Sequence, residues 1–167
     1  ELATLAKDIN NKVLKDDFTH AEKAMVKSMK HNDFAKMKKK AMRVLFNRKI
    51  VKMIKNKGLE DRTEYITFSK HATKEFIRLA PKGTPVYYLE GDLTPKELKA
   101  WGCAGPDYHF SVFQKHPEWI KECHDLGMKV NAWTVNEAKD MEWLISQGVD
   151  FITTNEPVVL EEILKKK

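Results

Sequence analysis

The feature that most constrains the fold is a regular alternation of short apolar runs and amphipathic segments over residues 58–167. Residues 129–136 form an apolar run that ends in an aromatic and polar tip, and after a segment with helical spacing residues 148–157 contain a second apolar run. Strands that alternate with helices about every 20 to 25 residues form right-handed βαβ units. The sequence therefore predicts an α/β fold with a mainly parallel sheet, with strands at 65–68, 86–89, 108–113, 130–135 and 151–153.

Signals for helix ends support this order. Thr94 followed by Pro95 predicts a helix start with proline at the first helical position. Gly58 and Gly127 follow amphipathic segments and predict helix ends. Between the strands we expect helices at about 70–79, 117–126 and 137–147, another that begins at Thr94-Pro95, and a last one at 160–164.

Charge divides the chain into two regions. Residues 1–57 hold 16 Lys and Arg against 6 Asp and Glu, a net charge of +10, whereas residues 58–167 hold 14 against 18, a net charge of −4. No glycine or proline precedes Gly58, and apolar residues recur at helical spacing. We predict a basic helical segment of two to three helices over residues 1–47 and a second domain over residues 48–167.

Length and composition limit the class of protein. The 167 residues, of which 42% are hydrophobic and 32% charged, are typical of a soluble globular protein. The chain is shorter than the roughly 250 residues of a complete β/α barrel. No apolar run is long enough to span a membrane, and the first residues are too polar for a signal peptide, so we expect a soluble protein without membrane contact. Cys103 and Cys123 are expected to be inert thiols.

From about residue 48 to the end, the chain resembles the C-terminal half of the glycerophosphodiester phosphodiesterase family, which are TIM-barrel enzymes. The matching segments lie in the same order and at similar separations, at 49–54, 58–62, 66–69, 133–136 and 148–157. The resemblance implies a partial, half β/α barrel of four to five mainly parallel strands. The family often has Asp where Asn155 stands, and residues 1–47 carry no resemblance.

Catalysis in this family uses two histidines and a divalent metal held by carboxylates, mostly on the first four strands. His124-Asp125 and Glu97-Leu-Lys99 spell two of its motifs but fall within predicted helices, away from the mouth of the barrel. We therefore assign no catalytic residue, and we expect no cofactor unless another chain completes a Mg²⁺ or Ca²⁺ site. This chain alone is not expected to be an enzyme.

A remnant of a substrate pocket is the remaining site prediction. The resemblance places Trp133 and Phe68 at strand tips, where they would form an apolar wall against a glycerol group; the alternative is that both are core aromatics. His109 is predicted to face the mouth, or to be a structural histidine. Glu90 and Asp92 are weak metal candidates, and a loop cap ahead of Thr94 is the alternative.

A half-barrel leaves two unpaired sheet edges and one uncovered face. The basic helices of residues 1–47 are predicted to pack on or near that face, and a homodimer through the half-barrel edges is another way to cover it. Such a combination is typical of a recombined, truncated or engineered chain.

Three hypotheses follow for function. The first is a catalytically incomplete half-barrel with a folding or assembly role. The second is a metal-dependent phosphodiesterase that needs a complementary N-terminal half. The third, less favoured, is binding of nucleic acid or an anionic surface through the lysine-rich helices of residues 1–47.

Overall fold

The computed structural model of the protein describes residues 45–166. These residues contain one five-stranded sheet in which each strand pairs in parallel with the next along the chain, in the order β1-β2-β3-β4-β5. The predicted α/β fold with a parallel sheet is confirmed. The strands are β1 (Tyr65–Thr67), β2 (Val86–Tyr88), β3 (Gly105–His109), β4 (Asn131–Trp133) and β5 (Phe151–Ile152).

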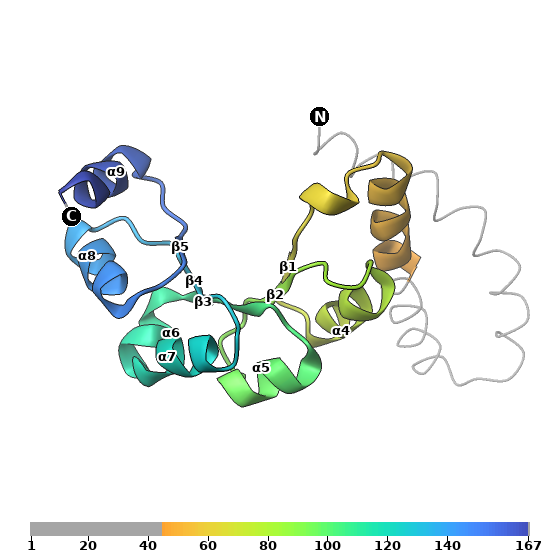
Figure 1. The fold of residues 1–167 in the computed structure, drawn as a ribbon, viewed down its shortest axis with the longest axis horizontal. Helices are drawn as coiled ribbons and strands as arrows, with labels where there is room; N and C mark the ends of the chain where they lie inside the picture. Colours follow the sequence, from red (N-terminus) through yellow and green to blue (C-terminus); the bar gives the residue numbers. More distant parts are fainter. Residues whose placement is uncertain (1–44, 167) are drawn as a thin grey trace, which may run out of the picture. The chain divides into compact units, whose positions relative to one another are not determined.

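Helices connect the strands and line one side of the strand row (Figure 1). A helix over residues 45–56 and the short turn η1 (Glu60–Arg62) precede β1. The helices expected within residues 1–44, their packing on the sheet, and most of the proposed segment 1–47 lie outside the described residues. The connecting and closing helices are α4 (Lys70–Leu79), α5 (Pro95–Trp101), α6 (Phe110–Lys115), α7 (Glu118–Asp125), α8 (Ala138–Gln147) and α9 (Pro157–Lys165).

Local capping chemistry sets several of these helix ends. The Thr94 hydroxyl accepts from the Glu97 main-chain N–H, and the Glu97 carboxylate accepts from the Thr94 N–H at 2.8 Å, which makes a capping box with Pro95 at the first position. Gly102 and Gly148 end α5 and α8 with φ of 85° and 83°, a backbone conformation that favours glycine. The residues of the capping box lie within four positions of one another, and the predicted start of α5 is confirmed.

The bounds predicted for the third strand, 108–113, are wrong. The strand is β3, which ends at His109, and Phe110 begins α6. The His109 Nδ1 accepts a hydrogen bond from the Ser111 main-chain N–H and so caps this helix. Gly105 belongs in the strand because β3 and the chain before β4 approach closely there: a Cβ on Gly105 would lie 1.7 Å from the Lys129 carbonyl oxygen.

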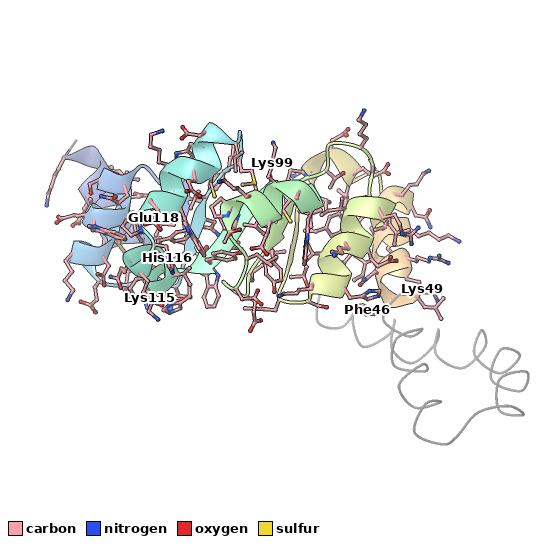
Figure 2. The ribbon with its side chains drawn as sticks, turned by 90° about the horizontal axis from the view of Figure 1, so that it is seen from below. Phe46, Lys49, Lys99, Lys115, His116 and Glu118 are labelled. Atoms are coloured by element: carbon pink, nitrogen blue, oxygen red, sulfur yellow. The ribbon has the colours of Figure 1, made fainter. Side chains whose placement is uncertain are left out.

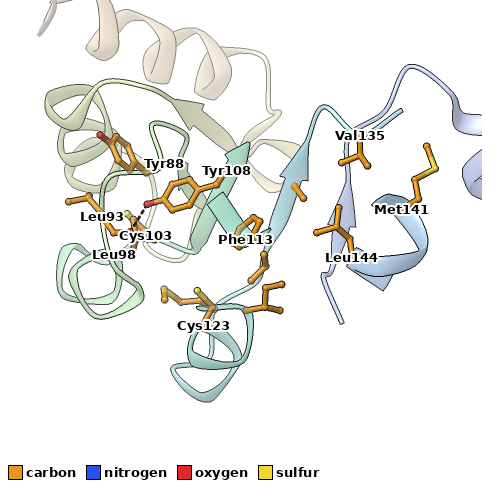
Figure 3. Packing of buried hydrophobic residues seen from close by; sticks show 14 of the residues in the cluster. Tyr88, Leu93, Leu98, Cys103, Tyr108, Phe113, Cys123, Val135, Met141 and Leu144 are labelled. Carbon is orange, nitrogen blue, oxygen red and sulfur yellow. Dashed lines mark hydrogen bonds between the residues drawn. The ribbon is translucent and has the colours of Figure 1, made fainter. Parts of the chain in front are cut away.

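The main hydrophobic core lies between the sheet and the helices (Figure 3). Tyr108 and Phe113 are fully buried in it, and the Tyr108 hydroxyl donates to the Leu93 carbonyl at 2.9 Å. Cys103 and Cys123 are buried and unpaired, as predicted, and burial raises the pKa of Cys103 to about 11 and of Cys123 to about 12. The Tyr108 hydroxyl thus has a hydrogen-bond partner inside an otherwise apolar core.

The other face of the sheet carries several exposed apolar side chains. Side chains alternate along each strand, so residues next to the core residues in sequence point to this second face, here called the inner face. Ile66, Phe68 and Phe151 are 60%, 54% and 45% exposed, although all three are large apolar residues. Within residues 45–166 the helices thus bury one face of the sheet, and part of the inner face is accessible to solvent. No helix within residues 45–166 is both long and apolar enough to cross a membrane.

Candidate functional site

Three predicted pocket residues meet at the carboxyl ends of the strands. Phe68 follows β1, and His109 and Trp133 are paired neighbours at the ends of β3 and β4. The Trp133 ring makes edge-to-face contacts with Phe68, at 5.7 Å between centroids, and with His109, at 5.2 Å. We call these three residues the mouth cluster. Edge-to-face geometry is favourable for aromatic pairs, so the rings hold one another in place.

The Trp133 side chain is also held by a hydrogen bond. Its indole N–H donates to the Asp107 carbonyl oxygen at 2.7 Å, across the β3–β4 pair. The chain after it is tied to the last strand, because the Val135 N–H donates to the Thr153 carbonyl and the Asn155 N–H donates to the Asn136 side-chain oxygen, both at 2.9 Å. Asn155 uses its main chain in this bond, so the bond does not depend on Asn or Asp at this position.

A polar network lies below the mouth cluster on the inner face. The Asn131 amide donates to the Asp107 carboxyl at 2.7 Å and to the Thr153 hydroxyl at 3.1 Å. Burial raises the pKa of Asp107 to about 6, and the hydrogen bond from Asn131 acts in the opposite direction. A pocket of about 220 Å³ opens here, lined by Glu64, Ile66, Tyr87, Asp107, Asn131, Phe151, Ile152 and Thr153.

Asp107 and Asn131 were not among the site residues predicted from the sequence. Asp107 and His109 are two residues apart on β3, and Asn131 and Trp133 are two apart on β4, so each pair shares one face of the sheet. The strand period of two was the signal that could have found Asp107 and Asn131, once the bounds of β3 were known. The register Asp107 to Asn131 then follows from the parallel pairing.

The carboxylates at the end of β2 do not fit a metal ion. One Asp92 oxygen accepts from the Tyr88 hydroxyl at 2.8 Å and the other from the Lys70 ammonium at 2.6 Å, and these bonds hold the pKa of Asp92 below its usual range. A cation beside the Lys70 ammonium would be repelled. Glu90 is exposed. Within residues 45–166 no three His, Cys, Asp or Glu side chains are grouped to hold a metal. The geometry favours a loop contact for Asp92.

The two motif look-alikes lie on helices, as predicted. His124 on α7 has its Nε2 2.9 Å from an Asp150 oxygen, and that oxygen also accepts from the Val130 N–H at 2.8 Å. Asp150 and Val130 precede β5 and β4, so this contact is at the amino ends of the strands, opposite the mouth cluster. Glu97 is used in the α5 capping box, and Lys99 lies on the exposed side of α5 (Figure 2).

The sequence matches the glycerophosphoryl diester phosphodiesterase family over residues 6–159. The chain belongs to this family. The match begins at residue 6, so it includes most of the segment in which the sequence analysis found no resemblance.

Similar proteins carry the same family name. A glycerophosphodiester phosphodiesterase from Caldanaerobacter subterraneus subsp. tengcongensis is 29% identical over 119 residues, which are 71% of this chain and 49% of that protein. The crystal structure of a glycerophosphodiester phosphodiesterase from Parabacteroides distasonis is 48% identical, with a TM-score of 0.73, over 75% of this chain and 52% of that one. One from Agrobacterium tumefaciens, 13% identical with a TM-score of 0.59 over 71% and 52% of the two chains, shows the shared fold.

The chain spans about half the length of these relatives. The part described here has the α/β architecture of the family, with five parallel strands in one sheet.

Proposed function

We propose that the described residues form the glycerol-binding side of a glycerophosphodiester phosphodiesterase site, and that this chain does not complete catalysis alone. The observation that carries the proposal is the mouth cluster of Phe68, His109 and Trp133. It lies at the carboxyl ends of parallel strands, where β/α barrels bind their substrates. Membership in the family supplies the substrate class.

The chemistry of the cluster suits the alcohol part of the substrate. Trp133 and Phe68 offer apolar surface to C–H groups, and Phe68 is 54% exposed, so this surface is accessible. Hydrolysis of a phosphodiester needs acid/base groups and charge neutralisation in addition. His124 and Glu97, which spell motifs of the family, are engaged in structural contacts elsewhere. The binding surface is therefore proposed for this part of the site, and the catalytic groups are not.

Binding by the full chain tests the first half of the proposal. Titration calorimetry with sn-glycerol 3-phosphate is expected to detect binding to the wild-type chain. Trp133→Ala is expected to weaken it by about tenfold or more, because a buried apolar contact and its hydrogen-bonded support are lost. Trp119→Phe is the matched control, since Trp119 lies on α7 and its ring stacks on the His116 ring at 4.3 Å between centroids, outside the mouth cluster. Equal affinity of Trp133→Ala and wild type would overturn the proposal.

Turnover tests the second half. The full chain with Mg²⁺ or Ca²⁺ is expected not to hydrolyse a glycerophosphodiester, and Trp133-dependent turnover is expected after addition of the N-terminal half of the Parabacteroides distasonis relative. Turnover by this chain alone refutes the claim of incompleteness. An assembled but inactive mixture, with assembly measured by light scattering, refutes the claim that the described residues are the substrate-binding side.

The open inner face favours a second candidate function, assembly. Within residues 45–166, β1 and β5 each pair on one side only, and exposed Ile66 and Phe151 lie on the face between them. Unpaired edges beside exposed apolar residues are typical of a surface that pairs with another chain segment. Because the chain spans about half of its relatives, we propose the complementary half of the family domain as the occupant.

Light scattering distinguishes this occupant from a second copy. The chain is expected to have its monomer mass of 19.4 kDa alone and to form a one-to-one complex with the complementary half. Ile66→Lys is expected to abolish the complex, with Lys121→Glu on the exposed side of α7 as the control. A dimer in the absence of the complementary half would replace this occupant by a second copy. The nucleic-acid hypothesis concerns residues 1–47, nearly all outside the described residues, and stays a prediction.

A further inference from the structure

We propose that His109 is a specificity-determining residue of this site, a neutral imidazole whose Nε2–H donates a hydrogen bond to a ligand oxygen at the mouth. The inference rests on the proposed function and adds to it the group that recognises the ligand's oxygen. It is carried by the contacts of the two ring nitrogens, which differ from each other.

The geometry at Nδ1 is that of a hydrogen-bond acceptor. The Ser111 main-chain N–H donates to it at 3.3 Å, and the Ser111 hydroxyl lies 2.8 Å from it and can donate as well. A main-chain N–H can only donate, so Nδ1 carries no proton in this contact. In a neutral imidazole the single ring proton is then on Nε2. The cap of α6 therefore sets the tautomer.

Within the described residues, the Nε2 atom is available to a ligand. Among the hydrogen bonds made by residues 45–166 none involves Nε2 of His109, and the atom is not one of the enclosed polar atoms that lack a partner. The ring is fixed by its edge-to-face contact with Trp133 and by stacking on Phe110 at 4.7 Å. Nδ1 is thus engaged within the fold and the ring packs against two aromatic neighbours, so Nε2 is the ring nitrogen left for recognition.

The neighbouring rings define what this donor recognises. A ligand whose C–H groups pack on Trp133 and Phe68 places its oxygens beside the imidazole. Both a hydroxyl and a phosphate oxygen are acceptors for a neutral N–H. The chemical class is a small polyol phosphate, and a hydrogen bond of this kind contributes about threefold to tenfold in affinity.

The tautomer is measured first, by long-range proton–nitrogen NMR of the full chain labelled with ¹⁵N-histidine. The His109 ring, assigned through its loss in a His109 variant, is expected to show an unprotonated Nδ1 and a protonated Nε2. Glycerol 3-phosphate is expected to shift the Nε2 signal. Separate titrations with glycerol and with inorganic phosphate show whether a hydroxyl or a phosphate oxygen accepts the hydrogen bond from Nε2–H. A proton on Nδ1 in the free protein would overturn the inference.

Two variants separate ligand recognition from helix capping. His109→Asn keeps a short acceptor for the Ser111 N–H and removes the distal donor, whereas His109→Gln keeps a distal N–H and weakens the cap. We expect His109→Asn to lose about threefold to tenfold in affinity for glycerol 3-phosphate with an unchanged urea midpoint, and His109→Gln to retain most of the affinity. A merely structural histidine would give the opposite order, lower stability for Gln and unchanged binding for Asn.

The same data distinguish failure of the inference from failure of the proposed function. Binding that depends on Trp133 and not on His109 would refute the role of His109 and leave the proposed function standing. Binding that depends on neither Trp133 nor His109 would refute the proposed function and the inference together. No binding by the wild-type chain would refute both as well.

Discussion

Replacing Asp107 by asparagine is expected to stabilise the protein at neutral pH and to have no effect near pH 4. The Asp107 side chain is 5% exposed on the inner face and accepts one hydrogen bond, from Asn131. Burial raises its pKa to about 6, so the charged form is less favourable in the folded chain than in the unfolded chain. An asparagine keeps the side-chain oxygen that Asn131 needs and carries no charge.

The sign follows from the two pKa values. Below a pH of about 4 the carboxyl is protonated in both states and costs nothing. Between about 4 and 6 the unfolded chain ionises first, so the free energy of unfolding falls as the pH rises; above about 6 both states are charged and the cost is constant. A rise of about two pKa units corresponds to about 3 kcal/mol. Because the carboxyl lines a pocket that opens to solvent, we expect about 1 to 2 kcal/mol after screening.

Urea unfolding at several pH values between 4 and 8 measures the effect. The difference in free energy of unfolding between Asp107→Asn and wild type is expected to grow from zero to about 1 to 2 kcal/mol over this range. Asp125→Asn is the matched control, because Asp125 is exposed on α7 beside Lys121 and is expected to change stability by less than about 0.5 kcal/mol. A variant less stable than wild type at neutral pH, or a difference that does not vary with pH, would refute the reasoning.

Two substitutions, followed by urea unfolding, and one thiol-labelling experiment test the fold further. Thr94→Ala removes the α5 capping box and is expected to cost about 1 kcal/mol; an unchanged midpoint would contradict the cap. Gly105→Ala places a Cβ 1.7 Å from the Lys129 carbonyl oxygen and is expected to cost about 3 kcal/mol or more, so a wild-type midpoint would contradict the close approach. Burial raises the pKa of Cys103 to about 11 and of Cys123 to about 12, so Ellman's reagent near pH 8 is expected to react only after unfolding. Rapid reaction of the folded protein would show that a thiol is accessible.

Local signals made most of the fold predictable. The predicted helix over 70–79 has these bounds in the structure, and its first turn is capped by the Ser69 hydroxyl, which accepts from the Ala72 N–H. Thr94 and Pro95 predicted the start of α5 for the same reason, since all the groups of a cap lie within four residues. The parallel order of strands followed from the helices between them, because a crossover connection leaves few alternatives.

The bounds of β3 could not be predicted because distant contacts set them. The aromatic run after Tyr108 has the composition of a strand, but the His109 ring caps a helix there. Gly105 enters the strand because the backbone near Lys129 approaches it, and no neighbour in sequence indicates this contact. The error moved the strand by several residues and hid Asp107 from the list of candidate site residues. A site that depends on strand register is therefore less predictable than the elements that hold it.

The β3–β4 register places residues that affect stability and residues proposed to bind the ligand next to each other, and experiments can separate their effects. It pairs Asp107 with Asn131 below and His109 with Trp133 above, on the same face. The lower pair includes a buried carboxyl that opposes folding at neutral pH, whereas the upper pair presents an aromatic wall and a hydrogen-bond donor. Residues that cost stability are expected where a surface serves binding. Changes at Asp107 should therefore act through the pH dependence of unfolding, and changes at His109 through ligand affinity.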